Sequence, residues 1–112
     1  PDGTLQTLDF PREGSTRVSG TVDGYRHTSY LVPVAKGQTL TVTLESPSTN
    51  AYFNVHDAAD SSGFAIFNGN SGERTARLTA SEDMTYVIRP FQPRASARRN
   101  EQVPYSLAVE RK

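Results

Sequence analysis

The alternation of apolar and polar residues along most of the chain constrains its fold more than any other feature of the sequence. Apolar side chains recur at every second position in residues 40–44, 51–55 and 105–109. This spacing places them on one face of an extended strand and leaves the other face polar. No window of helical length carries the i, i+3, i+4, i+7 spacing of an amphipathic helix. The chain is therefore expected to build half-buried β-strands.

Turn-forming residues divide the rest of the sequence into pieces of strand length. Weaker alternation occurs in six further segments, which gives about nine strands in all: 5–10, 15–22, 29–34, 63–68, 73–79 and 84–91. Clusters of Gly, Pro, Asn, Asp and Ser separate the strands, and residues 69–72 are expected to form a hairpin turn. We predict an all-β fold, an antiparallel two-sheet β-sandwich resembling a jelly roll, with residues 1–112 in a single domain.

Composition narrows the classes of function. Twelve Lys and Arg balance twelve Asp and Glu, so the chain lacks the overall field that attracts nucleic acid or anionic lipid. The absence of cysteine excludes disulfides and thiolate chemistry and leaves the fold to packing alone. No apolar run approaches the ~18 residues of a membrane span. We expect a monomer without cofactors, nucleic-acid binding or a membrane span, from which any leader has been removed.

The residues that could carry catalysis or bind a metal lack a supporting motif. His27 and His56 are the two histidines, and neither lies in a metal-binding or triad spacing. No Gly-x-Ser-x-Gly turn is present. Asp57 and Asp60 supply at most two carboxylates, so a weak Ca²⁺ site there is a disfavoured alternative. We expect no metal site and no enzyme activity.

The strongest functional signal is Arg-Ala-Ser-Ala-Arg-Arg-Asn at residues 94–100, which we call the arginine loop. Together with Arg89 it holds four of the twelve cationic side chains, with no acidic residue between them. Several like charges cannot be buried together without a large desolvation cost. The arginine loop is therefore expected to face water or an acidic partner.

The arginine loop lies in a long connection, residues 92–104, where function and mobility concentrate. One helical turn within it would place Arg94 and Arg98 on the same face, because they are four positions apart. The ordinary alternative is a solvated loop in which Arg98 or Arg99 pairs with Glu101 at little net energy.

A series of short motifs over nearly the whole chain resembles one bacterial family. The motifs are Ser-Gly-Thr-Val-Asp-Gly at 19–24, Tyr30, Lys-Gly-Gln-Thr-Leu-Thr-Val at 36–42, Tyr-Phe-Asn-Val at 52–55, Tyr-Val-Ile-Arg at 86–89, and the arginine loop followed by Tyr-Ser-Leu at 105–107. They are similar to the periplasmic inhibitors of g-type (goose-type) lysozyme, β-sandwiches related to bacterial pre-peptidase C-terminal domains. The resemblance implies a periplasmic or secreted bacterial protein that binds g-type lysozyme and protects peptidoglycan.

The resemblance also implies which residues contact the lysozyme. In the family's pattern a tyrosine and two arginines spaced by four mark the inhibitory surface, which corresponds here to Tyr30, Arg94 and Arg98. Tyr25 is the alternative tyrosine, because Tyr30 shares its alternating spacing with Val32 and Val34 and can equally lie in the core. Arg99 and Asn100 join the set by proximity alone, and Arg89 is expected to support the loop from the sheet. The loop would enter the acidic cleft in which lysozymes cut glycan.

Two other functions fit the same sequence. A carbohydrate- or cell-wall-binding module would use exposed aromatic rings, for which Tyr25 and Tyr52 are the candidates. An accessory sandwich domain of an exported protein would need no site of its own. Fold-level similarity does not decide between these functions and inhibition.

Overall fold

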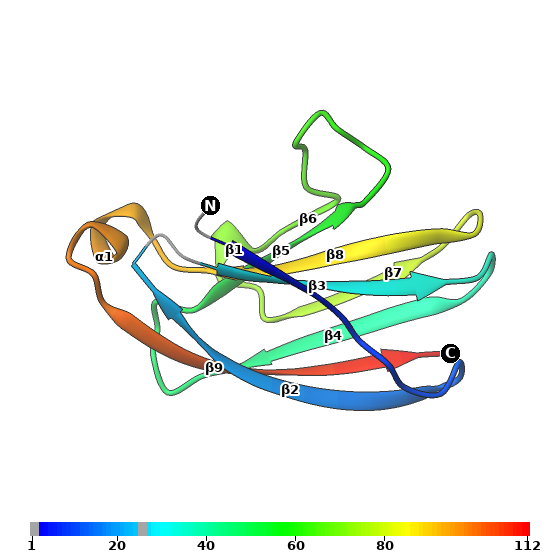
Figure 1. Cartoon of the computed structure of the whole chain (residues 1–112), viewed down its shortest axis with the longest axis horizontal. Helices are drawn as coiled ribbons and strands as arrows, with labels where there is room; N and C mark the ends of the chain where they lie inside the picture. The colour runs from blue at the N-terminus through cyan, green and yellow to red at the C-terminus, as the bar shows by residue number, and fades with distance from the viewer. Residues whose placement is uncertain (1–2, 25–26) are drawn as a thin grey trace.

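The computed structural model describes residues 3–24 and 27–112, which form two β-sheets packed face to face (Figure 1). The five-stranded sheet contains, in spatial order, β1 (Gly3–Thr7), β3 (His27–Val34), β8 (Met84–Phe91), β5 (Tyr52–Asp57) and β6 (Phe67–Asn68). The four-stranded sheet contains β2 (Gly14–Asp23), β9 (Gln102–Arg111), β4 (Thr39–Glu45) and β7 (Thr75–Thr79). A 3₁₀ helix, η1 (Gly69–Ser71), and a short helix, α1 (Arg94–Arg98), complete the described elements. The predicted two-sheet sandwich of nine strands is confirmed.

The pairing is antiparallel except at one edge, where β1 runs parallel to β3. Between these two strands the chain crosses to β2 in the other sheet and returns (Figure 1). Because it reverses direction on entering β2 and again on leaving it, β1 and β3 point the same way. The alternation of apolar and polar residues within each strand does not predict this parallel pairing.

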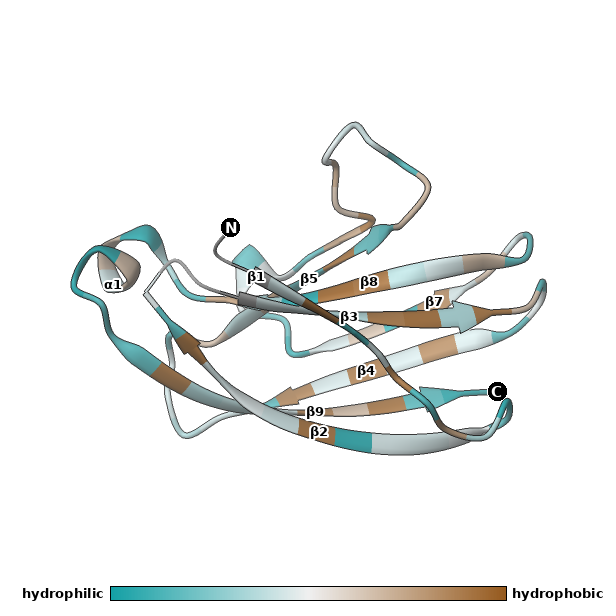
Figure 2. Cartoon of the chain, viewed as in Figure 1, coloured by the Kyte–Doolittle hydropathy of each residue, from teal (hydrophilic) through white to brown (hydrophobic). Residues whose placement is uncertain are grey.

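The core fills the space between the inner faces of the two sheets. Leu40, Val42 and Leu44 of β4 are at most 2% exposed, and Phe53 and Val55 of β5 are fully buried. Apolar and polar positions alternate along several strands in Figure 2. Each apolar side chain buried in this way contributes about 1.5–3 kcal/mol relative to an exposed one. Since the chain has no cysteine, this packing holds the sheets together.

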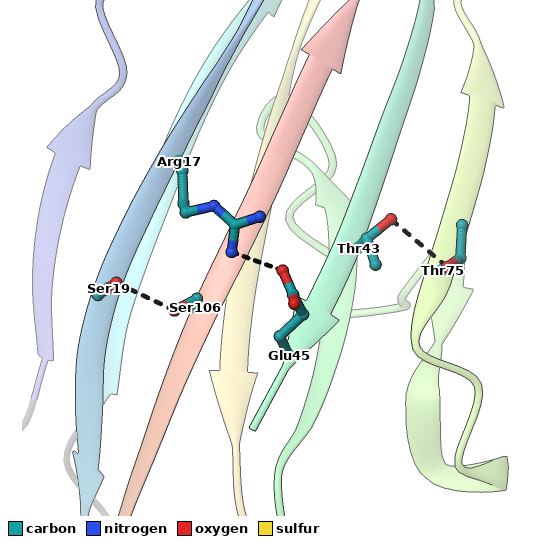
Figure 3. A network of polar contacts seen from close by, with 6 residues as sticks. All are labelled: Arg17, Ser19, Thr43, Glu45, Thr75 and Ser106. Carbon is teal, nitrogen blue, oxygen red and sulfur yellow. Dashed lines mark hydrogen bonds and ion pairs between the residues drawn. The ribbon is translucent and has the colours of Figure 1, made fainter. Parts of the chain in front are cut away.

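The outer face of the four-stranded sheet is polar and open to solvent (Figure 3). The hydroxyls of Ser19 and Ser106 lie 3.1 Å apart across β2 and β9, and Arg17 pairs with Glu45 at 2.5 Å. Both side chains of that ion pair are more than half exposed, so it contributes little to stability. These cross-strand contacts support the register of a solvated face.

A pair of tyrosines links the sheets inside one end of the sandwich. Tyr30 of β3 and Tyr105 of β9 are 3% and 5% exposed, and their hydroxyls form a hydrogen bond of 2.7 Å. The rings meet edge to face at 6.5 Å. Gly20 of β2 leaves room for them, because a Cβ atom there would lie 2.6 Å from the Tyr105 hydroxyl.

A buried arginine closes the opposite end. Arg111, 8% exposed, donates from its guanidinium to the carbonyl oxygens of Phe10, Pro11, Arg12 and Pro33. The guanidinium carbon also lies 4.3 Å from the centre of the Phe10 ring, a cation–π distance. Backbone carbonyls thus solvate this charge in place of water, and the contacts join the segment before β2 to the end of β9.

Three local expectations are wrong. The strand expected over residues 63–68 shortens to β6, with Phe64 and Ile66 exposed at 78% and 47%. Residues 69–72 form no hairpin turn, because η1 carries the chain from β6 in one sheet to β7 in the other. The long connection ends at Glu101, since β9 begins at Gln102 and includes Pro104. Proline is tolerated there because β4 pairs with β9 only from Ser106 onward.

Substituting Gly20 tests the packing around the tyrosine pair. Gly20→Ala forces a Cβ atom against the Tyr105 hydroxyl, so we expect the free energy of unfolding to fall by about 1–3 kcal/mol, the cost of overpacking a core. Urea denaturation measures the loss. Ser15→Ala, at an exposed position of the same strand, is the control and should stay within about 0.5 kcal/mol of the parent. Equal stability of the two variants would contradict the assigned role.

The tyrosine pair also predicts how the protein responds to alkaline pH. Burial, and next the hydrogen bond with Tyr30, raise the pKa of Tyr105 above its ordinary value of 10.0. The unfolded chain releases this proton near pH 10 whereas the folded chain keeps it, so the stability is complete below that pH and declines as the pH rises further. Tyrosinate absorbance should show Tyr105 ionising only as the fold is lost. Full tyrosine ionisation near pH 10 with native circular dichroism would contradict this.

Candidate functional site

The candidate site lies at the end of the sandwich where α1 projects (Figure 1). The β8–β9 connection, residues 92–101, carries α1 and the arginine loop. The turn between β2 and β3 begins beside it, where the backbone N–H of Gly24 donates to the carbonyl of Glu101 at 3.1 Å. The tyrosine pair lies three residues into β3 and three residues into β9, so the buried Tyr30 and Tyr105 form the floor beneath these loops.

The expected helical turn is confirmed, and its ends explain how so short a helix forms. The N–H of Asn100 donates to the carbonyl of Ala97 at 2.9 Å, and the N–H of Glu101 donates to that of Ser96 at 3.2 Å. This pair of bonds, with Asn100 at φ 55°, is a Schellman motif with asparagine in the left-handed position. Ser96 and Ala97 are 2% and 3% exposed. Burial of one face and the C-terminal cap therefore stabilise a helix too short to be stable alone.

The opposite face of α1 presents Arg94 and Arg98 to solvent. Both side chains are exposed, and α1 spans one turn from the first to the second. Neither guanidinium forms an ion pair with any residue that the structure describes. Like charges four positions apart on a helix repel one another by a few tenths of a kcal/mol. The helical turn thus holds together two positive groups that have no ion-pair partner in the described part of the chain, although their mutual repulsion slightly destabilises it.

Two further arginines that the structure describes in this region, Arg99 and Arg89, are engaged within the protein. Arg99 donates from Nε to Oε2 of Glu101 at 2.5 Å, as the solvated-loop alternative expected for one of the two arginines. Its side chain is 62% exposed, so this pair adds little stability. Arg89 donates from Nε to the Ser29 hydroxyl at 3.0 Å, on the neighbouring strand β3. Arg89 therefore ties two strands of the sheet below the connection.

Gln92 and Gly24 join the two loops. The Gln92 side chain is 6% exposed, and its Nε2 donates to the carbonyl oxygens of Gly24 and Glu101, each at 2.9 Å. Gly24 adopts φ +59°, and a Cβ atom there would lie 3.0 Å from Oδ1 of Asn100. Glycine adopts this positive φ without strain, and its lack of a Cβ atom leaves room for the Asn100 side chain.

The structure places the predicted tyrosines differently. Tyr30 occupies the core, which is one of the two positions that its spacing left open, so we omit it from the contact surface and assign it to the floor of the site. Tyr25 lies outside the described residues, directly after Gly24. Tyr52, a candidate for glycan binding, is partly covered, with its ring centre 5.7 Å from that of Phe91.

No cluster of three or more metal-ligating side chains occurs within residues 3–24 and 27–112. His56 contacts the carbonyl oxygen of Phe64 through Nδ1 at 3.2 Å, on a strand away from α1. Among the same residues no helix is long and apolar enough to cross a membrane.

Comparison with solved structures identifies the family. A periplasmic inhibitor of g-type lysozyme from Aeromonas hydrophila, PliG, superposes with a TM-score of 0.87 at 35% sequence identity, over 99% of this chain and 98% of that chain. The chain belongs to the family of periplasmic g-type lysozyme inhibitors. The PliG protein of Salmonella Typhimurium shares the fold at 22% identity and a TM-score of 0.73, over 97% and 99% of the two chains. These members of the family are inhibitors rather than enzymes, and this chain is a non-enzymatic protein as expected.

The wider relationship suggested by the sequence is also confirmed at the level of the fold. The pre-peptidase C-terminal domain of a Bacillus anthracis collagenase superposes with a TM-score of 0.67 at 16% identity, over 96% of this chain and 94% of that chain. No protein-family model matches the sequence, and no curated protein sequence matches it.

Sequence reasoning located the arginine loop but missed the residues that anchor it. Gln92 carried no signal, because its two acceptors lie on loops that meet only in the folded chain. The one available indication was the Asp23-Gly24 pair, which marks a turn where a backbone can approach closely.

Replacing Asn100 separates its backbone role from its side chain. Asn100→Gly should keep or slightly raise the thermal stability, because glycine adopts a positive φ without cost. Asn100→Ala should lower the free energy of unfolding by about 1 kcal/mol, because alanine is disfavoured in the left-handed conformation of this residue. Differential scanning calorimetry measures both. Equal stability of the alanine and glycine variants would show that the left-handed cap does not matter.

Proposed function

We propose that this protein inhibits g-type lysozyme and that the arginine loop enters the active-site cleft of the enzyme. The observation that supports the proposal is the pair of solvent-facing arginines on α1, neither of which forms an ion pair within residues 3–24 and 27–112. They lie in a connection fixed by backbone hydrogen bonds, on a chain of this family. A rigid, positively charged projection is complementary to a cleft that holds acidic catalytic residues.

In this proposal Arg94 and Arg98 bind the carboxylates of the cleft. A guanidinium can form two parallel hydrogen bonds to one carboxylate, and such charge-assisted bonds are strongest where water is excluded. Two arginines one turn apart can engage two carboxylates, or one carboxylate and adjacent carbonyl groups. Occupying the cleft excludes the glycan substrate, so inhibition needs no chemical step by the inhibitor.

The neighbouring residues have supporting roles in the proposed interface. Arg99, already paired with Glu101, lies at the rim of α1 and can contribute to electrostatic attraction. Asn100 holds the left-handed cap and carries its side chain toward Gly24. Tyr25 follows Gly24 in the sequence, and we propose it as the tyrosine of the contact surface in place of Tyr30.

We further propose a periplasmic or exported location, in which the protein would protect bacterial peptidoglycan. The family supports this location, and the fold depends on no cysteine, so it tolerates an oxidising compartment as readily as a reducing one. We propose that one monomer binds one lysozyme.

Charge removal on α1 tests the proposal directly. Arg94→Ala and Arg98→Ala should each weaken inhibition of g-type lysozyme by about 2 kcal/mol or more, which is roughly a thirtyfold rise in the inhibition constant. Peptidoglycan lysis measures the inhibition constant. Arg77→Ala is the matched control, because it removes the same charge from an exposed position on the edge strand β7. It should inhibit as the parent does.

Selectivity and salt dependence complete the test. The parent should leave c-type and invertebrate-type lysozymes active, and added salt should slow its association with g-type lysozyme more than it speeds dissociation. Full inhibition by both alanine variants would refute the assignment of the site. No inhibition by the parent at micromolar excess would refute the function, and sedimentation with purified peptidoglycan would then test the glycan-binding alternative.

A further inference from the structure

One buried side chain connects the two loops at the candidate site. Gln92 follows the last residue of β8, and its Nε2 donates one hydrogen bond to the carbonyl of Gly24 and another to that of Glu101. A carboxamide nitrogen carries two hydrogens, so both are used. Gly24 begins the β2–β3 turn and Glu101 ends the β8–β9 connection, and no other described side chain donates to both.

The orientation of this carboxamide is fixed by its partners. Both acceptors are carbonyl oxygens, so a flipped side chain would set oxygen against oxygen. In the observed orientation Oε1 is buried and has no hydrogen-bond partner among the described residues. A buried acceptor without a donor is unfavourable. The carboxamide thus satisfies two backbone carbonyls while its own oxygen stays unsatisfied, and this arrangement holds only while Gly24 and Glu101 keep their present positions.

The bridge continues to the arginines. Glu101 accepts from Gln92 and from the N–H of Gly24 through its carbonyl, and its own N–H donates to Ser96 within α1. The position of Glu101 therefore fixes the C-terminal end of α1, from which Arg98 projects. By itself α1 is too short to hold this direction, and its two like charges oppose it.

We propose that Gln92 is a positioning residue for inhibition, which holds α1 and Gly24 in their binding arrangement before the lysozyme arrives. This inference rests on the proposed function. Ordering a loop in advance removes an entropic cost from association, because the apparent affinity scales with the fraction of molecules already in the competent conformation.

The decisive variant is Gln92→Met, which keeps the length of the side chain and removes both donors. Its inhibition constant for g-type lysozyme should rise at least tenfold at a temperature where circular dichroism shows the native fold. In the free protein, hydrogen exchange should accelerate at the amides of Gly24, Asn100 and Glu101, while the amides of β4 and β5 keep their parental rates. A purely structural role would instead change exchange throughout the sandwich.

The chain offers a matched control at the far end of the sandwich. Gln38 donates from Nε2 to the carbonyl of Arg12 at 2.9 Å and accepts from the N–H of Ala35 at 2.8 Å. Gln38→Met removes a similar number of side-chain hydrogen bonds in the turn between β3 and β4. It should inhibit with the parental constant even if its melting temperature falls as far as that of Gln92→Met.

A second variant tests the same proposal if Gln92→Met does not fold. Gln92→Glu keeps the shape of the side chain but places a carboxylate against two carbonyl oxygens. Hydrogen exchange at the amides of Gly24, Asn100 and Glu101 should therefore accelerate at neutral pH, and accelerate less at a pH where the new carboxyl group is protonated. Parental inhibition by a folded Gln92 variant, or parental exchange at Gly24 and Glu101, would overturn the positioning role. A parent that fails to inhibit would instead refute the proposed function, while the exchange experiment still tests the bridge.

Discussion

The hydrogen bond between the hydroxyls of Tyr30 and Tyr105 sets the relation between the two strands that carry the site. It crosses the core from β3 to β9, and each of these strands starts where one of the two loops ends. Gly20 allows the contact by leaving its space empty. With the strands fixed beneath them, the turn at Gly24 and the end of the connection at Glu101 are close enough to share hydrogen bonds.

Much of this arrangement could be predicted from short-range patterns. Alternation located the strands that have one face against the core, such as β4, β5 and β9, and the spacing of Arg94 and Arg98 predicted the helical turn. It was less accurate for the edge strands β1, whose described side chains are exposed, and β6, which has two residues. Spacing alone could not decide whether Tyr30 is buried, since both faces of β3 were compatible with a tyrosine. The contact between Gln92 and Gly24 joins residues 68 positions apart, and it follows from sheet packing rather than from any local signal.

Departures from ordinary stabilising patterns gather in the β8–β9 connection. It contains two like charges on one turn, an asparagine with positive φ and a buried acceptor without a described partner. Elsewhere β2, β4 and β9 alternate regularly, and even the buried Arg111 is matched by backbone carbonyls. Local features that disfavour stability and coincide in one exposed segment are characteristic of sites selected for binding. The structural features and the charge pattern of the sequence therefore indicate the same segment as the candidate binding site.

The pairing of β2 with β9 has a consequence for the order in which the chain can fold. Among the described strands of its sheet, β2 pairs with β9 alone, over ten registered pairs from Gly14 with Arg111 to Asp23 with Gln102. A growing polypeptide that lacks residues 102–111 would leave β2 without a partner and would leave the segment around Phe10 without Arg111. Contacts of such long range form slowly. The four-stranded sheet therefore cannot be completed until residues 102–111 have been synthesised, and β2 takes its place only together with β9.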